Sequence, residues 1–516
     1  MKSSEAPDTD WGYRVMPHGH FFKDVGETIF FVLVFLVLAG CGETPPRPTE
    51  TILKSIDGGR ISVADFEQRV AEIMDRATVS GLGCVILNDG RIVYNQTFGF
   101  RDMETGELLD QRSVFNAASF SKPVFAYLVV LLAEDGVIDL DRPIYEYLGK
   151  PIPETDNYSD LAGDERWREI TARMVLSHST GFPNWRFLTE EQRLSFLFDP
   201  GSRFGYSGEG IQLLQTVIED LTGLDLESLA KEKVFGPLGM SDSSYVWQPS
   251  YESAFAIPHN EFGWVGNPKR RSVPAAAGSL TTSAGDFGRF LEAVITRERG
   301  AEPGSLAMTD TVLSVTSERM LGPGAQREGD SGDGVSISWG LGWGVFDCPL
   351  GRAFFHTGHD IGEQNYTVSF IDQGIGVVLL SNSDNFESVA EELVEAAIGD
   401  TYSPFTWLGY EPFDPARRRT PPPRPDRVQV AAEILEPYTG HYGISDTEGF
   451  WIKADGARLL YSGEGEFWDE IVAESTTRFR FRGQDVTLTF VSGSDGRVDH
   501  IEIDYQGLPL SATRVE

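Results

Sequence analysis

Hydrophobic side chains recur at helical spacing over residues 66–74, directly after Ser62 and Asp65, which have the spacing of a helix N-terminal cap. The next segment, residues 82–94, alternates between apolar and polar positions and is divided by the turn sequence Asn88-Asp89-Gly90. The pattern predicts a helix followed by a β-hairpin at the start of the folded region.

The middle of the chain has mainly helical periodicity. One apolar stripe covers residues 211–221 and is stopped by Gly223, a residue type that commonly ends helices. Strand-like segments return over residues 337–380, and a helical segment follows at residues 388–398. This order predicts a mixed α/β (α+β) domain over residues 60–408, with one antiparallel sheet, flanking helices and a helical insertion.

Short strand-like segments separated by turns fill the C-terminal part of the chain. They lie between residues 450 and 503 and predict a small all-β barrel over residues 430–516. Residues 409–429, which are rich in proline and arginine, are predicted to be a linker. Residues 42–59 begin with a Pro/Thr/Glu-rich stretch and are predicted to be a tether.

A short apolar run precedes this tether. It covers residues 29–38, which is too few to span a bilayer comfortably, and it ends in Leu38-Ala39-Gly40-Cys41. Residues 1–41 therefore have the layout of a signal peptide, and their last four residues resemble a bacterial lipoprotein box. That resemblance implies cleavage before Cys41, lipidation of its thiol, and anchoring of an exported protein in the cell envelope. The alternative is an uncleaved hydrophobic anchor, which also exports the rest of the chain.

The net charge bears on nucleic-acid binding, and the cysteine content bears on disulfide bonds. The chain has 516 residues and a formal net charge of −35, so binding to nucleic acid is not expected. Besides Cys41 only Cys84 and Cys348 are present, which allow one disulfide at most and do not make a disulfide scaffold.

The first chemical candidate is Ser119-x-x-Lys122, directly before the apolar residues 124–132. At this spacing the two side chains share one helical face. A serine hydroxyl needs a neighbouring base to become a nucleophile, and a desolvated lysine can supply one near neutral pH. The tetrapeptide alone is a weak signal, because a serine cap followed by a solvated lysine gives the same pattern.

Two further stretches follow in order, Tyr206-Ser207-Gly208 and His356-Thr357-Gly358-His359. Over residues 60–400 the chain thereby resembles the serine β-lactamase and penicillin-binding D-Ala-D-Ala carboxypeptidase family, and within it the class C branch. That branch has S-x-x-K, Y-x-N and K-T-G or H-T-G in this order. Residues 438–442 also resemble the start of a lipocalin-like domain that is often appended to such hydrolases.

The resemblance implies a fold and a role for each residue. The fold would be the β-lactamase/transpeptidase-like sheet, and Ser119 would form an acyl-enzyme with Lys122 as proton acceptor. Tyr206 would carry protons to the leaving group and later activate water. His356 would stand where many relatives have lysine.

The remaining roles concern the oxyanion and the substrate. Thr357 and Gly358 would line the substrate strand, where Gly358 allows close approach because it has no Cβ. Backbone N–H groups of Ser119 and His359 would form the oxyanion hole. His178, in the loop of residues 176–183, is predicted to be structural.

The family's asparagine is replaced here by Gly208, which favours an esterase or a D-amino-acid peptidase over an efficient β-lactamase. The expected substrate is thus an ester or a D-amino-acid peptide, with β-lactams and D-Ala-D-Ala peptides as alternatives. A catalytically silent envelope-binding protein is a further alternative. Metal-assisted hydrolysis through His356, His359 and Asp360 is not favoured, since no H-E-x-x-H motif is present, and neither a metal nor a cofactor is expected.

Overall fold

The structure, a computed structural model, describes residues 52–300, 306–310, 313–314, 335–421, 426–444, 449–463, 468–493, 497–505 and 507–515. Cys41 and the apolar run before it lie outside the described residues, so their predicted roles are considered below as proposals. No helix within the described ranges is long and apolar enough to cross a membrane.

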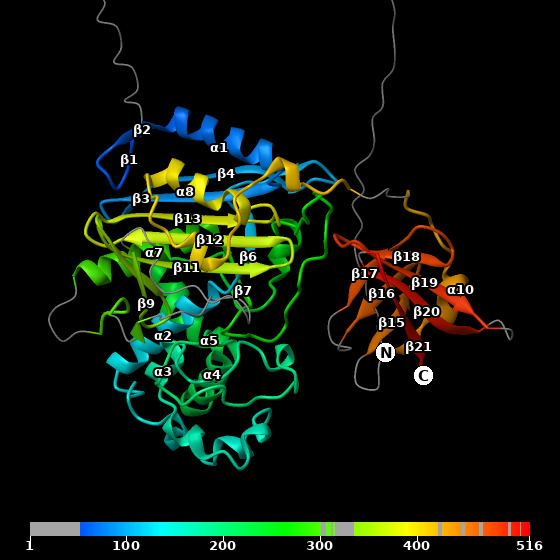
Figure 1. The fold of residues 1–516 in the computed structure, drawn as a ribbon, viewed down its shortest axis with the longest axis horizontal. Coiled ribbons are helices and arrows are strands. Elements are labelled where there is room, and N and C mark those ends of the chain that lie inside the picture. Colours follow the sequence, from blue (N-terminus) through cyan, green and yellow to red (C-terminus); the bar gives the residue numbers. More distant parts are fainter. Residues whose placement is uncertain are drawn as a thin grey trace, which may run out of the picture. The chain divides into compact units, whose positions relative to one another are not determined.

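A nine-stranded antiparallel sheet forms the centre of the larger domain (Figure 1). In spatial order its strands are β5 (Glu107–Leu108), β4 (Arg91–Asp102), β3 (Gly81–Asn88), β13 (Ile375–Ser381), β12 (Glu363–Phe370), β11 (Gly351–Asp360), β10 (Gly344–Cys348), β9 (Ser336–Trp339) and β8 (Leu313–Ser314). Strand β3 pairs with β13, with Cys84 opposite Leu379, so the two ends of the domain join inside one sheet. This arrangement confirms the predicted fold class.

Helices cover both faces of this sheet, and strand β3 shows why. Val85 and Leu87 are buried in the core that includes α7 (Ala284–Arg299). Cys84 and Ile86 point the other way, into a core shared with α1 (Val63–Ala77) and α8 (Ala390–Ile398). Because successive strand residues face opposite sides, a strand covered on both faces is apolar throughout, as β3 is.

The helical insertion begins directly after strand β6 (Val114–Ala118) and the nucleophile candidate Ser119. A second, two-stranded sheet pairs β6 with β7 (Leu280–Ser283) at the two ends of the insertion. The helices of the insertion are α2 (Ser121–Glu134), α3 (Ala172–Leu176), α4 (Gly208–Thr222), α5 (Leu226–Ala230) and α6 (Gly236–Leu238). Helix α4 begins after a Ser207 cap and ends at Gly223 in the left-handed conformation, as the sequence predicts.

Two boundaries differ from the sequence prediction. Strands β1 (Ile52–Lys54) and β2 (Arg60–Ser62) form a hairpin, so residues 52–59 are folded and are not part of a tether. The first of the strand-like segments expected over residues 337–380 is divided into β9 and β10 by a turn at Gly342, whose φ is +82°. A Cβ on Gly342 would lie 2.3 Å from Ala126, so this turn is set by packing against α2, which local sequence does not report.

The C-terminal domain is a closed barrel of antiparallel strands in sequential order. Its strands are β14 (Gly440–Gly443), β15 (Gly449–Asp455), β16 (Arg458–Ser462), β17 (Asp469–Ala473), β18 (Arg478–Phe481), β19 (Val486–Ser492), β20 (Val498–Tyr505) and β21 (Leu508–Arg514). A short helix, α10 (Ala432–Leu435), precedes them. Aromatic and branched side chains such as Tyr442, Phe450 and Phe490 fill its interior. The barrel confirms the all-β prediction and agrees with the lipocalin-like resemblance.

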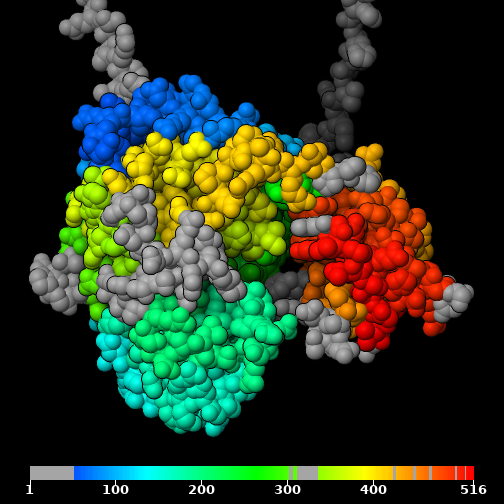
Figure 2. Space-filling view, viewed as in Figure 1, coloured from blue at the N-terminus to red at the C-terminus, as the bar shows by residue number. Residues whose placement is uncertain are grey.

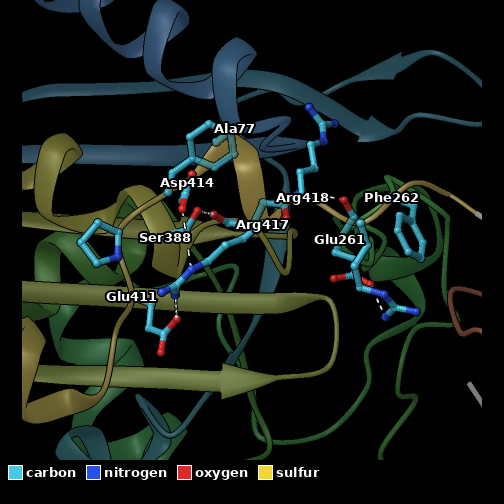
Figure 3. A pocket seen from close by; sticks show the side chains of 12 residues that line it. Ala77, Glu261, Phe262, Ser388, Glu411, Asp414, Arg417 and Arg418 are labelled. Carbon is cyan, nitrogen blue, oxygen red and sulfur yellow. Dashed lines mark hydrogen bonds and ion pairs between the residues drawn. The ribbon is translucent and has the colours of Figure 1, made fainter.

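The segment after α9 (Phe405–Leu408) remains attached to the larger domain, beside α8 and α1 (Figure 2). The Phe413 N–H donates to the Ser388 carbonyl, and Arg418 donates to the Thr78 hydroxyl. Arg417 pairs with Glu411, and the segment borders a surface hollow of about 190 Å³ (Figure 3). The predicted linker therefore begins with residues that pack against the hydrolase domain.

Candidate active site

The nucleophile candidate lies in a tight turn between β6 and α2. Ala118 has φ +47°, which is unusual for a residue with a Cβ and costs backbone energy. Asn116 supports it, because its side-chain oxygen accepts the Ala118 N–H at 3.0 Å. Ser119 follows and is partly exposed.

Lys122 is almost fully buried, with 1% of its surface exposed, one turn into the helix. Its Nζ lies 2.9 Å from Ser119 Oγ and 2.6 Å from the Ala277 carbonyl oxygen. Burial lowers the pKa of Lys122 to about 7, because it disfavours the charged ammonium form. A free amine directed at the serine hydroxyl is therefore available near neutral pH.

The chain contains a second Ser-x-x-Lys, at Ser228 and Lys231, which serves as an internal comparison. The Lys231 side chain is 55% exposed and pairs with Glu227 at 2.9 Å. Ser228 bonds back to Asp225 as part of the cap of α5. The same four-residue pattern thus gives a helix cap with a solvated lysine here and a nucleophile with a buried base at Ser119.

Tyr206 forms the third part of the site. Its ring centroid lies 4.9 Å from Lys122 Nζ, and it is buried. Burial raises the pKa of Tyr206 above its usual value, against a smaller lowering influence from the Ser119 hydroxyl. The phenol is thus protonated in the resting site, which leaves Lys122 as the base for Ser119 and Tyr206 as a proton donor.

His178 supports Tyr206 rather than reaching the nucleophile. The two rings lie 4.2 Å apart, and His178 Nδ1 accepts the Ser207 N–H at 3.1 Å. Burial, with Lys122 and His356 nearby, lowers the pKa of His178 well below its usual value, so the ring is neutral. This geometry agrees with the structural role predicted for His178.

Strand β11 brings the His356-Thr357-Gly358-His359 stretch beside the nucleophile turn. Strand β10 pairs only with residues 351–355 of β11, so residues 356–360 leave that edge without a partner in β10. A Cβ on Gly358 would lie 2.5 Å from the Ala117 carbonyl, which explains the glycine. Strand β11 therefore passes in close backbone contact with the end of β6, just before Ser119.

His356 is fully buried, and its Nδ1 donates to the Thr357 carbonyl at 2.7 Å. Burial and the Lys122 charge lower the pKa of His356 to about 3. The imidazole is neutral at physiological pH, so it provides no positive charge where many relatives have lysine. The His359 side chain points elsewhere and pairs with Glu387 at 2.8 Å.

A pair of carboxyl groups, the buried Glu363 and the partly buried Asp360, lies next to Asn116 of strand β6. Asn116 Nδ2 donates to Glu363 at 2.7 Å and to Asp360 at 3.2 Å. Burial, together with the Asp360 charge, raises the pKa of Glu363 to about 8. Burial opposes ionisation of Asp360 as well, but Lys269 outweighs it and keeps the pKa of Asp360 low. Near pH 7 Glu363 therefore holds a proton while Asp360 is ionised, and both accept from Asn116, which the sequence reading did not single out.

Gly208 has a steric reason that sequence reasoning missed. A Cβ at this position would meet the ring of Trp185 at 2.6 Å. Trp185 belongs to the loop after α3, so only the folded chain brings the two residues together.

Metal binding gains no support from the residues that the structure describes. Within those ranges no group of three or more His, Cys, Asp and Glu side chains could hold a metal ion. Asp360 pairs with Lys269, and His359 pairs with Glu387.

The surface hollow in Figure 3 contains none of the predicted site residues.

A serine in a tight turn, a buried lysine amine and a protonated tyrosine under one antiparallel sheet define a serine hydrolase of the acyl-enzyme type. The sequence profile of the family described as "Beta-lactamase" matches residues 66–399, and the chain belongs to this family.

Relatives agree with this assignment. The chain is 23% identical over 445 residues to "Penicillin-binding protein 4*" of Bacillus subtilis, covering 79% of this chain and 89% of that protein. It is 25% identical over 407 residues to "Esterase EstB" of Burkholderia gladioli, covering 66% and 97%. The solved structure of D-alanine carboxypeptidase AmpC from Burkholderia cenocepacia matches with a TM-score of 0.51 and 18% identity, covering 66% of this chain and 99% of that one. That likeness supports the fold.

Proposed function

We propose that this protein is an exported esterase that forms an acyl-enzyme on Ser119. The observation that carries the proposal is the buried Lys122 amine 2.9 Å from a partly exposed serine hydroxyl. A silent binding protein would have no need to bury this lysine, because taking an ammonium group out of water is unfavourable.

The reaction would proceed in two half-reactions. Lys122 accepts the proton of Ser119 as Oγ attacks the ester carbonyl, and backbone N–H groups at Ser119 and His359 stabilise the oxyanion. Tyr206 donates a proton to the departing alkoxide. Water then attacks the acyl-enzyme and gives a proton to the Tyr206 phenolate, and Lys122 returns its proton to Ser119 Oγ as the carboxylic acid departs.

Two features favour uncharged esters over β-lactams and D-Ala-D-Ala peptides. Both β-lactams and D-Ala-D-Ala peptides carry a carboxylate, and the neutral His356 offers this carboxylate no positive charge. The family's amide-contacting asparagine is replaced here by Gly208, which has no side chain to contact a substrate amide. Relatives named "Esterase EstB" and "Lovastatin esterase" support the same choice, whereas a relative named "D-aminopeptidase" keeps D-amino-acid amides as the second candidate.

The test is acylation by p-nitrophenyl acetate, followed by product release and by intact mass. We expect turnover and a mass increase of one acetyl group in the wild type, and neither in Ser119→Ala. Ser228→Ala is the matched control, since it alters the other Ser-x-x-Lys and should leave turnover intact. Full activity in Ser119→Ala would refute the assignment.

Envelope anchoring is part of the proposal and rests on Leu38-Ala39-Gly40-Cys41. The mature protein would begin at a lipidated Cys41, and more than one acyl chain would hold it stably in the membrane. We expect Cys41→Ser to shift the protein from the membrane fraction to the soluble fraction. Unchanged processing and unchanged membrane fractionation would contradict lipidation.

A further inference from the structure

Trp185 lies where a substrate-recognising side chain would otherwise extend from the site. Ser207 has an extended backbone, with φ −138° and ψ 112°, so the residues on either side of it direct their side chains to the same side. Tyr206 faces Lys122 on that side. The Cβ direction of Gly208 therefore points to the same side as Tyr206, and what it meets at 2.6 Å is the indole of Trp185.

The indole is held in this place by bonds on both sides of it. Asn184, which precedes it, accepts the Gly208 N–H at its carbonyl and at its side-chain oxygen. Arg186, which follows it, forms a paired interaction with Glu209 at 2.9 and 2.7 Å, and the Glu209 side chain is only 7% exposed. Such a bidentate pair is geometrically specific, so Trp185 is held in a fixed place beside Gly208.

The aromatic surface continues outward from Trp185. The ring of Phe187 stacks on it with centroids 6.1 Å apart and an interplanar angle of 10°. Phe187 and its neighbour Leu188 are 62% and 65% exposed, which is high for large apolar side chains. We call Trp185, Phe187 and Leu188 the aromatic shelf.

We propose that the aromatic shelf selects esters whose acyl group carries an aromatic ring. This inference rests on the proposed esterase function and names its substrate class. The resemblance to the family places an amide-contacting asparagine at Gly208, and here an indole face stands at that place. A flat apolar face stacks with a ring and offers no hydrogen-bond pair to an amide, and the neutral His356 adds no attraction for a carboxylate.

The experiment compares p-nitrophenyl phenylacetate with p-nitrophenyl acetate, so that only the acyl group changes. We expect kcat/KM in the wild type to favour the phenylacetyl ester, and Trp185→Ala to reduce that preference about tenfold, the scale of one aromatic contact. Trp185→Phe should keep part of the preference. Trp451→Ala is the matched control, because Trp451 is a partly exposed indole stacked on His441 in the barrel, and it should change neither rate.

A double-mutant cycle tests the geometry at Gly208. Gly208→Ala alone should reduce the phenylacetyl preference, because its Cβ displaces the indole. In the Trp185→Ala background the same change should have no further effect on the preference. No phenylacetyl preference in the wild type, or an equal loss for both esters in Trp185→Ala, would overturn the inference. Absence of any acyl-enzyme in the wild type would instead contradict the proposed esterase function.

Discussion

Lys122 and Lys231 both follow a serine by three residues, yet only Lys122 is buried. Their chemical difference is produced by the surroundings: Glu227 and solvent stabilise the Lys231 ammonium, whereas the Lys122 pocket stabilises the free amine. The surroundings also decide the charge of His356. Burial keeps its ring neutral, although the family that the chain resembles often has a lysine at this position.

The first prediction is a pH dependence of kcat/KM that rises through about pH 7. Below this value Lys122 is protonated and cannot accept the Ser119 proton, so the rate should fall about tenfold per pH unit. Lys122→Met should lose about a hundredfold or more at pH 8. Lys231→Met should keep both the rate and the profile. A wild-type profile that stays flat from pH 5 to 8 would contradict the role of Lys122.

The second prediction concerns stability and Glu363, whose pKa is raised from 4.5 to about 8 in the folded protein. Between pH 4.5 and 8 the folded state holds a proton that the unfolded state has lost, so stability falls as pH rises. The slope from this group is at most about 1.4 kcal/mol per pH unit. Glu363→Gln should remove this pH slope, because glutamine has no titrating group, and it should keep the hydrogen bond, because glutamine still accepts from Asn116. Urea denaturation at several pH values measures the slope.

The burial of Lys122 acts in the opposite sense and only at higher pH. Its lowered pKa makes folding more favourable as pH rises from about 7 toward 10.5. Because Lys122 is present in both proteins, its contribution cancels when the free energy of unfolding of Glu363→Gln is subtracted from that of the wild type. An identical pH slope in both proteins would contradict the raised pKa of Glu363.

At the scale of elements, strand β11 and the turn after β6 must pass within backbone contact of each other. Gly358 permits this approach, and Ala118 adopts its strained conformation in the same turn. Local patterning predicted the capped helices and the β3–β4 hairpin, where Asp89 and Gly90 have the positive φ values of a tight turn. It missed the division between β9 and β10, because that turn is set by packing against α2.

The third prediction is that Gly358→Ala loses about a hundredfold or more in kcat, because the added Cβ pushes β11 away from the Ala117 carbonyl and opens the oxyanion site. The steady-state rate with p-nitrophenyl acetate measures the loss. Gly149→Ala is the control, since its Cβ would meet no atom within 4 Å. Wild-type kcat in Gly358→Ala would show that the strand does not form the site.

At the scale of the whole molecule, the two domains have separate cores. The barrel interior is built from residues 430–512, and the two large cores of the hydrolase domain end at residue 413. Residues 410–419 nevertheless pack on the hydrolase domain through Phe413, Arg418 and Arg419, the last of which pairs with Glu261. A separation point therefore belongs after these residues.

The fourth prediction is that a protein of residues 52–421 folds and hydrolyses a small ester. One cooperative unfolding transition and acylation of Ser119 would confirm it. Ending the chain at residue 408 instead should destabilise the protein, since the contacts of Phe413 are lost. Insoluble protein from residues 52–421 would show that the barrel is needed for folding.

Local sequence alone determined the elements whose signals are local: capped helices, tight turns, alternating strands, and the order of the Ser119, Tyr206 and His356 stretches. Tertiary structure decided which of two Ser-x-x-Lys pairs is desolvated, that His356 is neutral, and that Trp185 stands over Gly208. These properties depend on burial and on contacts between segments far apart in the chain. The pKa of a group is set by the medium and the charges around it, and the place of Trp185 is set by contacts between distant segments. Neither property can be read from neighbours in sequence.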